Sequence, residues 1–194
     1  MNRIEFWLMN NPIRALIQRY EASRMRHMTD FKGGEVLEIG CGQGVGTLLI
    51  VRLFKPRKIT ALDLDPKMVE RAKRKVRLSH IHFEQGDASA LRFKEEEFDA
   101  VFDFGILHHI PNWEDALKEV HRVLKPKGLF ILEDLSIESF KLPLLGWVLR
   151  VLLDHPYKQM YKREELLDFT KKNGFKIVAK RMNPFWFNLI LEKE

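Results

Sequence analysis

Cysteine is almost absent from the 194-residue chain. The single residue, Cys41, excludes an internal disulfide and is typical of a protein from a reducing cytosol. Long hydrophobic runs are absent too. The longest uncharged one, Leu142 to Leu149, is interrupted by Pro143 and Gly146 and falls far short of the ~20 residues of a membrane helix. The first residues lack the layout of a signal peptide. We therefore expect a soluble, cytoplasmic protein.

Basic residues outnumber acidic ones, and the formal net charge is +6. The densest basic cluster lies on one predicted helix without interleaved aromatic residues that could stack on bases; it comprises Arg71, Lys73, Arg74, Lys75 and Arg77. This pattern is typical of a solvated helix face, so we expect no nucleic-acid partner. The charge leaves a contact with acidic substrates or a membrane surface open.

Hydrophobic segments of strand length alternate with amphipathic helical patterns, which predicts a parallel sheet covered by helices. Strands are predicted at 36–39, 58–62, 81–85, 98–102 and 129–133, and helices at 47–54, 66–78, 112 or 115 to 124, and 163–173. Two last strand segments, 175–180 and 185–191, flank Asn183 and Pro184 and predict a hairpin. The expected fold class is α/β, a Rossmann-like, doubly wound, mostly parallel seven-stranded sheet that ends in an antiparallel hairpin and carries helices on both faces.

Two hydrophobic segments are extra to this core. An N-terminal helix is predicted to begin at Asn11 and Pro12, and four of its residues form one apolar stripe: Ile13, Leu16, Ile17 and Tyr20. The second segment, at about 140–161, follows the fifth strand and is rich in leucine. We expect a helical cap over residues 1–30 and a main domain over residues 31–194. Both extra segments need an apolar surface to cover, in the core, on a second subunit or on a bound molecule.

Glycine is concentrated at one place, with four glycines in the seven positions from Gly40 to Gly46, directly after the first predicted strand. Glycines there let the backbone turn tightly and approach a ligand, at the edge where open α/β sheets bind one. A dinucleotide-binding Gly-x-Gly-x-x-Gly does not fit, because the sixth position holds Val45 or Thr47 in the two registers. A phosphate-binding P-loop is excluded as well, since no Gly-Lys-Ser/Thr follows.

Residues 36–44, Val-Leu-Glu-Ile-Gly-Cys-Gly-Gln-Gly, resemble motif I of the class I S-adenosylmethionine (SAM)-dependent methyltransferases nearly residue for residue. Four further segments resemble later motifs of that family in the same order: residues 61–66, 85–88, 98–110 and 121–128. The resemblance covers about residues 34–133. It implies a methyltransferase of the small-molecule or quinone type, with SAM as its cofactor.

The resemblance implies roles for residues at the carboxyl ends of the strands. Asp63 would accept hydrogen bonds from both ribose hydroxyls, with Leu64 beside it. Asp87 would accept from the adenine amine, and the Ala88 amide would face the ring. Glu38 is either a partner of the methionine ammonium or a strand-end carboxylate bonded to backbone amides. The remaining expected cofactor contacts are Gly40, Cys41, Gly42, Gly44 and Phe104, with Cys41 as a small structural residue rather than a nucleophile.

Catalytic residues stay unassigned, because simple methyl transfer does not require a base. His108 and His109 follow the fourth strand and would act either as a general base or as part of the loop lining. His155 and Tyr157, with Tyr161, lie in the insertion that would roof the pocket and could touch the acceptor. No metal site is expected.

The predicted reaction is an in-line displacement that moves the methyl group to a small acceptor. An apolar or lipid-like acceptor is favoured because the two extra segments are unusually hydrophobic, as shown by Phe6, Trp7, Leu8, Trp147, Leu149 and Leu152. Two alternatives stay open: a non-catalytic SAM-binding protein, and a nicotinamide-dependent oxidoreductase, which the glycine spacing disfavours. No feature of the sequence indicates an oligomeric state.

Overall fold

The computed structural model describes residues 12–141, 159–184 and 186–194. In chain order its elements are α2 (Pro12–Arg26), β1 (Glu35–Ile39), α3 (Val45–Phe54), β2 (Lys58–Asp63), α4 (Pro66–Lys75), β3 (Ile81–Gln85), β4 (Phe98–Phe104), η1 (Leu107–His109), α5 (Trp113–Val123), β5 (Leu124–Leu135), η2 (Ile137–Lys141), α7 (Arg163–Lys172), β6 (Phe175–Met182) and β7 (Trp186–Lys193). Most of the insertion therefore lies outside the described residues, and so do His155 and Tyr157.

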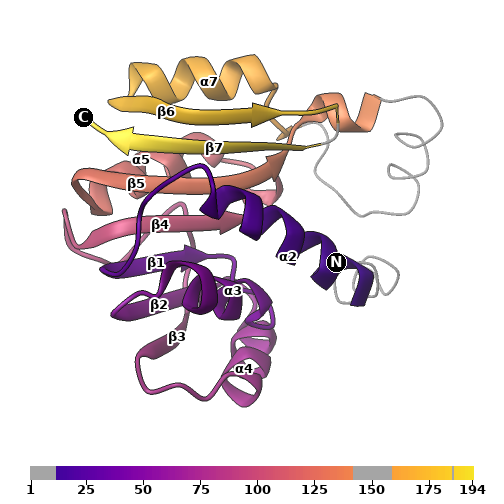
Figure 1. Cartoon of the computed structure of the whole chain (residues 1–194). Helices are drawn as coiled ribbons and strands as arrows, with labels where there is room; N and C mark the ends of the chain where they lie inside the picture. The colour runs from indigo at the N-terminus through magenta and orange to yellow at the C-terminus, as the bar shows by residue number, and fades with distance from the viewer. Residues whose placement is uncertain (1–11, 142–158, 185) are drawn as a thin grey trace.

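The strands form one seven-stranded sheet in the order β3-β2-β1-β4-β5-β7-β6 (Figure 1). The first five strands are parallel, and β7 runs antiparallel to both β5 and β6. This arrangement confirms the predicted fold class. The chain winds outward from β1 to β3 and then returns to place β4 on the other side of β1. Such a reversal of strand order is where open α/β sheets bind their ligands.

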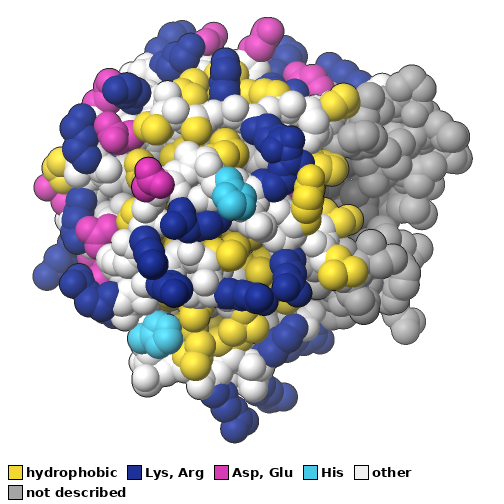
Figure 2. Space-filling model, in the orientation of Figure 1, with side chains coloured by type: hydrophobic (Ala, Val, Ile, Leu, Met, Phe, Trp, Pro, Cys, Tyr) yellow, Lys and Arg dark blue, Asp and Glu magenta, His cyan; other side chains and the backbone are white. Residues whose placement is uncertain are grey.

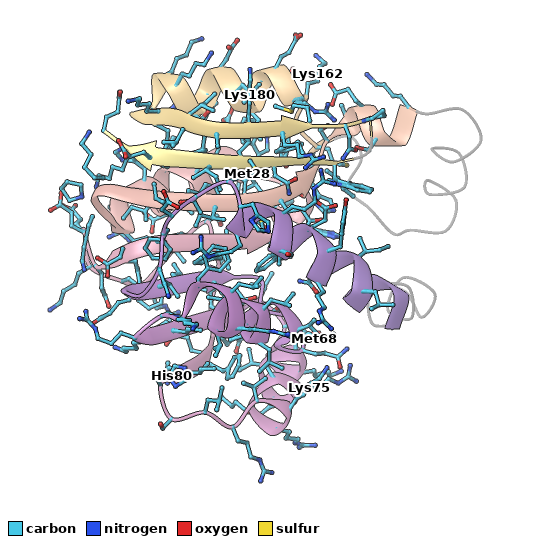
Figure 3. All side chains as sticks on the ribbon, viewed as in Figure 1. Met28, Met68, Lys75, His80, Lys162 and Lys180 are labelled. Carbon is cyan, nitrogen blue, oxygen red and sulfur yellow. The ribbon has the colours of Figure 1, made fainter. Side chains whose placement is uncertain are left out.

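Each face of the sheet carries its own hydrophobic cluster. One cluster packs α5 and α7 against the sheet, and the other packs α2, α3 and α4 against the opposite face. Figure 1 shows α2 and α3 in front of the sheet and α5 behind it. Met28, just beyond the end of α2, packs against the front cluster (Figure 3). The two covered faces explain why Phe98 to Phe104 is almost continuously hydrophobic.

Several predicted boundaries are wrong by a few residues. The helix predicted to reach residue 78 ends at Lys75, because Val76 is already extended and buried against the core. The segment from Lys125 to Gly128, where Pro126 and Gly128 favour a turn between the predicted helix and the predicted strand, is an irregularity inside a longer strand: Leu124 already pairs with Phe98, and the register shifts before Leu129 pairs with Ala100. Strand pairing at Leu124 therefore starts β5 directly after α5.

The N-terminal helix α2 is described from Pro12 onward, and the side that carries Leu16, Ile17 and Tyr20 is not the side that packs on the protein. Leu16 and Tyr20 are exposed, whereas Ala22 and Met25 are buried in the front cluster. Glu21 is also fully buried, and neither of its carboxylate oxygens has a hydrogen-bond partner among the described residues. The side with the small Ala22 packs against the core, so Leu16, Ile17 and Tyr20 are not covered by the core of the chain, one of the three surfaces considered above.

Candidate cofactor site

The glycine-rich turn connects the end of β1 to α3. Gly40, Gly42 and Gly44 all have positive φ, at 69°, 52° and 81°, and the Gly44 amide donates to the Cys41 carbonyl at 2.8 Å. A β-carbon on Gly40 would lie 2.5 Å from Cγ1 of Ile106. The turn after β1 therefore packs directly on the loop after β4, and only glycine fits between them.

Asp63, the last residue of β2, accepts hydrogen bonds from backbone amides of two different loops. Its Oδ2 accepts from the Gly42 amide at 2.8 Å, and its Oδ1 accepts from the Asp65 amide at 2.9 Å. The Gly86 amide, after β3, donates to the Asp63 carbonyl at 3.1 Å. Burial raises the pKa of the Asp63 carboxyl, and the two amides oppose this rise. Each carboxylate oxygen keeps a lone pair for a further donor.

The two residues after Asp63 have different surroundings. Asp65 caps α4, because its Oδ1 accepts from the Lys67 amide at 2.9 Å. Leu64 is 67% exposed at the same edge. An apolar side chain beside a carboxylate suits a ligand that joins an apolar ring to a sugar.

Asp87 and Ala88 follow β3 at this edge. The Asp87 Oδ1 accepts from the Ser89 amide at 2.8 Å and from its hydroxyl at 2.7 Å. Asp87 itself is exposed, whereas Ala88 is buried in the hydrophobic cluster on the face of the sheet that α5 and α7 cover. The carboxylate is thus held in place by its own loop while remaining open to solvent.

Glu38 is buried beneath the turn and accepts a short hydrogen bond from the Thr47 hydroxyl. Among the described residues its hydrogen-bond partner is this side chain of α3, whereas the alternative given above had it bonded to backbone amides. Burial raises its pKa from 4.5 to about 8, although the Thr47 hydrogen bond opposes the rise. A β-carbon on Gly46 would lie 2.3 Å from the Glu38 Oε1, 2.8 Å from the Phe104 ring and 3.3 Å from Gln18 Nε2. Side chains of β1, β4 and α2 thus meet at the first turn of α3.

Cys41 is buried beside the turn, and its amide donates to the Leu62 carbonyl at 2.9 Å. Burial raises the pKa of its thiol, and the Glu38 and Asp63 carboxylates raise it further. A thiol that stays protonated is a poor nucleophile. The environment suits a small packing residue.

A second polar cluster lies at the carboxyl end of β5, around the buried Asp134. Its Oδ2 accepts from the His108 amide at 3.0 Å and from the Tyr161 hydroxyl at 2.7 Å. Its Oδ1 accepts from the Leu135 amide at 2.7 Å and pairs closely with Nδ1 of the buried His108. The rings of His108 and His109 are 4.2 Å apart. Sequence reasoning missed Asp134, although an acid in a strand buried on both faces was a usable signal.

Asp103, near the end of β4, is a second buried acid that the sequence reasoning did not single out. It accepts from the amides of Ile106 at 2.8 Å and Leu107 at 3.3 Å, which fixes the loop that touches the glycine turn. Burial raises its pKa well above the usual value, and the charge of Asp134 adds to the effect.

The loops after β1, β2, β3 and β4 therefore meet at one edge of the sheet, where a turn without side chains adjoins the Asp63 carboxylate. A carboxylate there would repel a phosphate but accept hydroxyls from a ribose. The residues present thus fit the adenosyl part of SAM, which carries no phosphate. Among the described residues, no group of three or more His, Cys, Asp or Glu side chains could hold a metal ion, and no helix is long and apolar enough to cross a membrane. Fold and site define a Rossmann-like adenosyl-binding protein.

Comparison with known proteins narrows this class. Residues 37–132 match the family model described as a methyltransferase domain. Residues of the chain are 35% identical over 147 positions to the fatty-acid O-methyltransferase of Mycolicibacterium smegmatis, covering 76% of this chain and 52% of that protein. They are 37% identical over 126 positions to the phthiotriol/phenolphthiotriol dimycocerosates methyltransferase of Mycobacterium tuberculosis, covering 65% and 46%. The chain spans about half the length of these curated relatives.

The crystal structure of a SAM-dependent methyltransferase from Mesorhizobium loti has the same fold, with a TM-score of 0.73, 16% identity, and coverage of 88% of this chain and 96% of that one. The chain belongs to the class I SAM-dependent methyltransferase family, whose cofactor is SAM.

Proposed function

We propose that the protein is an enzyme that transfers a methyl group from SAM to a small apolar or lipid-like acceptor. The observation that carries this proposal is the hydrogen bond between the Gly42 amide and the Asp63 carboxylate. It joins a turn without side chains to the acid that would accept the ribose hydroxyls. Asp87 and Ala88 would hold the adenine, with Leu64 beside it. The rest of the cofactor site would be lined by Gly40, Gly44, Cys41 and Phe104.

Bound SAM would supply an electrophilic methyl group: the acceptor atom would form a bond to the methyl carbon as the carbon–sulfur bond opposite it breaks, with S-adenosylhomocysteine as the leaving group. The protein contributes by holding the donor and the acceptor in contact and in line, which can lower the barrier by several kcal/mol. Glu38 is buried and bonded to Thr47, so we assign it to the support of the turn. A contact between Glu38 and the methionine ammonium would require a change of its surroundings.

Two observations support an apolar acceptor. The chain is similar to a fatty-acid O-methyltransferase and to a phthiotriol/phenolphthiotriol dimycocerosates methyltransferase. It also carries two hydrophobic segments in addition to the core of the domain. The test is to incubate the protein with SAM and a panel of acceptors and to measure S-adenosylhomocysteine. The panel contains fatty acids and fatty alcohols of increasing chain length, prenylated hydroquinones, and hydrophilic amines and acids. We expect turnover to rise with the apolar part of the acceptor. Turnover on hydrophilic acceptors alone would contradict the proposal.

A role for His108 as general base has structural support. Asp134 holds Nδ1 of the ring and so selects the tautomer in which Nε2 carries the lone pair. The same carboxylate also fixes the His108 amide, which would suffice for a purely structural role of the loop. We propose that Nε2 of His108 takes the proton of acceptors that carry one. His109, whose ring packs on His108, completes the lining.

Two acceptors of similar length distinguish these roles. A fatty acid is ionised at neutral pH and needs no base, whereas a fatty alcohol must lose a proton. With His108→Gln we expect turnover of the alcohol to fall about 10²–10⁴-fold and turnover of the acid to change little. An equal loss on both acceptors would refute the base and leave a structural role.

The two alternative functions are tested by ligand binding. SAM and S-adenosylhomocysteine, at a hundredfold excess over the dissociation constant, should stabilise the fold by about 2.7 kcal/mol. Stabilisation by NAD or NADP instead would favour an oxidoreductase. Binding of SAM without S-adenosylhomocysteine formation on any acceptor would favour a non-catalytic SAM-binding protein.

A further inference from the structure

Four large hydrophobic side chains are exposed on the neighbouring helices α2 and α3. Leu16 is 64% exposed, Ile17 41%, Tyr20 57% and Leu48 39%. The first three fall at spacings that place them on one side of α2, and α2 packs against α3, which carries Leu48. We call these four residues the α2–α3 patch. Isolated exposed hydrophobic residues are common on soluble proteins, but three on one side of a helix, with a fourth on the helix that packs against it, indicate an interaction site.

The surroundings of the patch are basic. Among the side chains that the structure describes, the two helices hold one acid, Glu21, which is buried, and four arginines: Arg19, Arg24, Arg26 and Arg52. The Arg24 guanidinium donates to the Tyr20 hydroxyl at 2.5 Å and lies 4.9 Å from the centre of its ring. Among the residues that the structure describes, Arg19 and Arg24 form no ion pair. Figure 2 shows basic and hydrophobic side chains side by side in the lower part of the view, whereas acidic ones gather at the top and left.

A helix with a hydrophobic side flanked by arginines is suited to the surface of an anionic bilayer, where the apolar residues enter the headgroup region and the cations stay at the phosphates. A second copy of the chain is a poorer partner. A symmetric contact would bring Arg19 and Arg24 of both copies together without acids to neutralise them.

The patch also lies beside the candidate site. Gln18, on the same helix, reaches within 3.3 Å of the β-carbon position of Gly46, directly after the glycine turn. Figure 1 shows α2 crossing the edge of the sheet at which the parallel strands end. A bilayer bound here would thus adjoin the site, and an acceptor dissolved in it would have a short path to the cofactor. This last step rests on the proposed function, but the lipid contact does not.

We propose that the α2–α3 patch binds the surface of an anionic lipid bilayer. Each arginine near such a surface contributes about fivefold to partitioning, and each inserted leucine or isoleucine contributes on the order of tenfold. Binding is therefore strongest on anionic lipids at low salt and weakens as salt screens the arginines.

The test is sedimentation of the full chain with vesicles of phosphatidylcholine alone or mixed equally with phosphatidylglycerol. We expect partitioning into the mixed vesicles only. The double variant Leu16→Gln with Ile17→Gln should reduce it on the order of a hundredfold, because two inserted side chains are lost, and Arg19→Glu should reduce it by more than the roughly fivefold expected for the loss of one cation. Val178→Gln is the matched control, because Val178 is 51% exposed on β6, away from the patch. It should bind as the unaltered chain does.

Equal binding to both vesicle types, no binding, or unaltered binding by the double variant would overturn the inference. So would a dimer in light scattering that the double variant converts to a monomer. S-adenosylhomocysteine binding and turnover of a soluble acceptor are measured on the same proteins without vesicles. Normal turnover without vesicle binding would refute the lipid contact alone, whereas vesicle binding without turnover would refute the proposed function alone.

Discussion

Replacement of Asp63 by alanine should abolish most of the affinity for the cofactor. A charge-assisted hydrogen bond contributes about 1.5–3 kcal/mol, and Asp63 would make two with the ribose hydroxyls. Their loss amounts to about 3–6 kcal/mol, or roughly 10²–10⁴-fold in the dissociation constant. The change also releases the Gly42 amide, which now donates to Asp63 at 2.8 Å, so the turn loses part of its preorganisation.

Isothermal titration with S-adenosylhomocysteine measures this effect directly. Asp65→Ala is the matched control, because Asp65 is two residues away and caps α4 through the Lys67 amide. It should lower the free energy of unfolding by about 0.5–2 kcal/mol and leave the dissociation constant unchanged. Circular dichroism establishes that both variants are folded. A folded Asp63→Ala protein with the affinity of the unaltered chain would refute the ribose assignment.

Three further predictions concern the support of the site. The pKa of Glu38 is about 8 in the folded protein against 4.5 ordinarily, so between these two pH values the folded state holds a proton that the unfolded chain has lost. The free energy of unfolding should therefore fall as the pH rises from about 4.5 to 8, by at most ~1.4 kcal/mol per pH unit. Urea denaturation should show a weaker pH dependence of this free energy for Glu38→Gln, and an equally strong one would contradict the reasoning. The free energy of unfolding should be lower for Gly40→Ala than for Gly42→Ala by about 1–3 kcal/mol, because both changes strain the backbone but only the first collides with a neighbouring side chain. Equal free energies of unfolding for the two variants would argue against that close packing. Tyr161→Phe should lower the melting temperature through a loss of about 1–3 kcal/mol, since Asp134 loses a buried donor, and an unchanged melting temperature would show that the donor is replaceable.

The fold could be predicted from the sequence because its signals are local. A hydrophobic segment such as 98–102, between turn residues, specifies a strand buried on both faces, and the alternation with helices specifies parallel order. The boundary at Leu124 was missed because pairing with Phe98, 26 positions earlier, outweighs the local turn signal of Pro126 and Gly128. The same limit applies to α2. Its most hydrophobic side is visible in the sequence, but the shape of the sheet decides which side packs.

The position of the proposed cofactor residues at one edge of the sheet was predictable for a related reason. Gly42 and Asp63 belong to short motifs whose residues lie at strand ends, and the structure brings them into direct contact. The Asp134 cluster was not predictable from the sequence, because it joins residues from η1, β5 and the segment before α7. No spacing along the chain connects His108 with Tyr161, and only the folded sheet places them on one carboxylate.

The most direct test is a crystal structure with S-adenosylhomocysteine bound. We expect the ribose hydroxyls on the Asp63 carboxylate, the adenine edge at Asp87 and Ala88, and the glycine-rich turn against the nucleoside. A nucleoside bound elsewhere, or a turn that holds a pyrophosphate instead, would contradict the account.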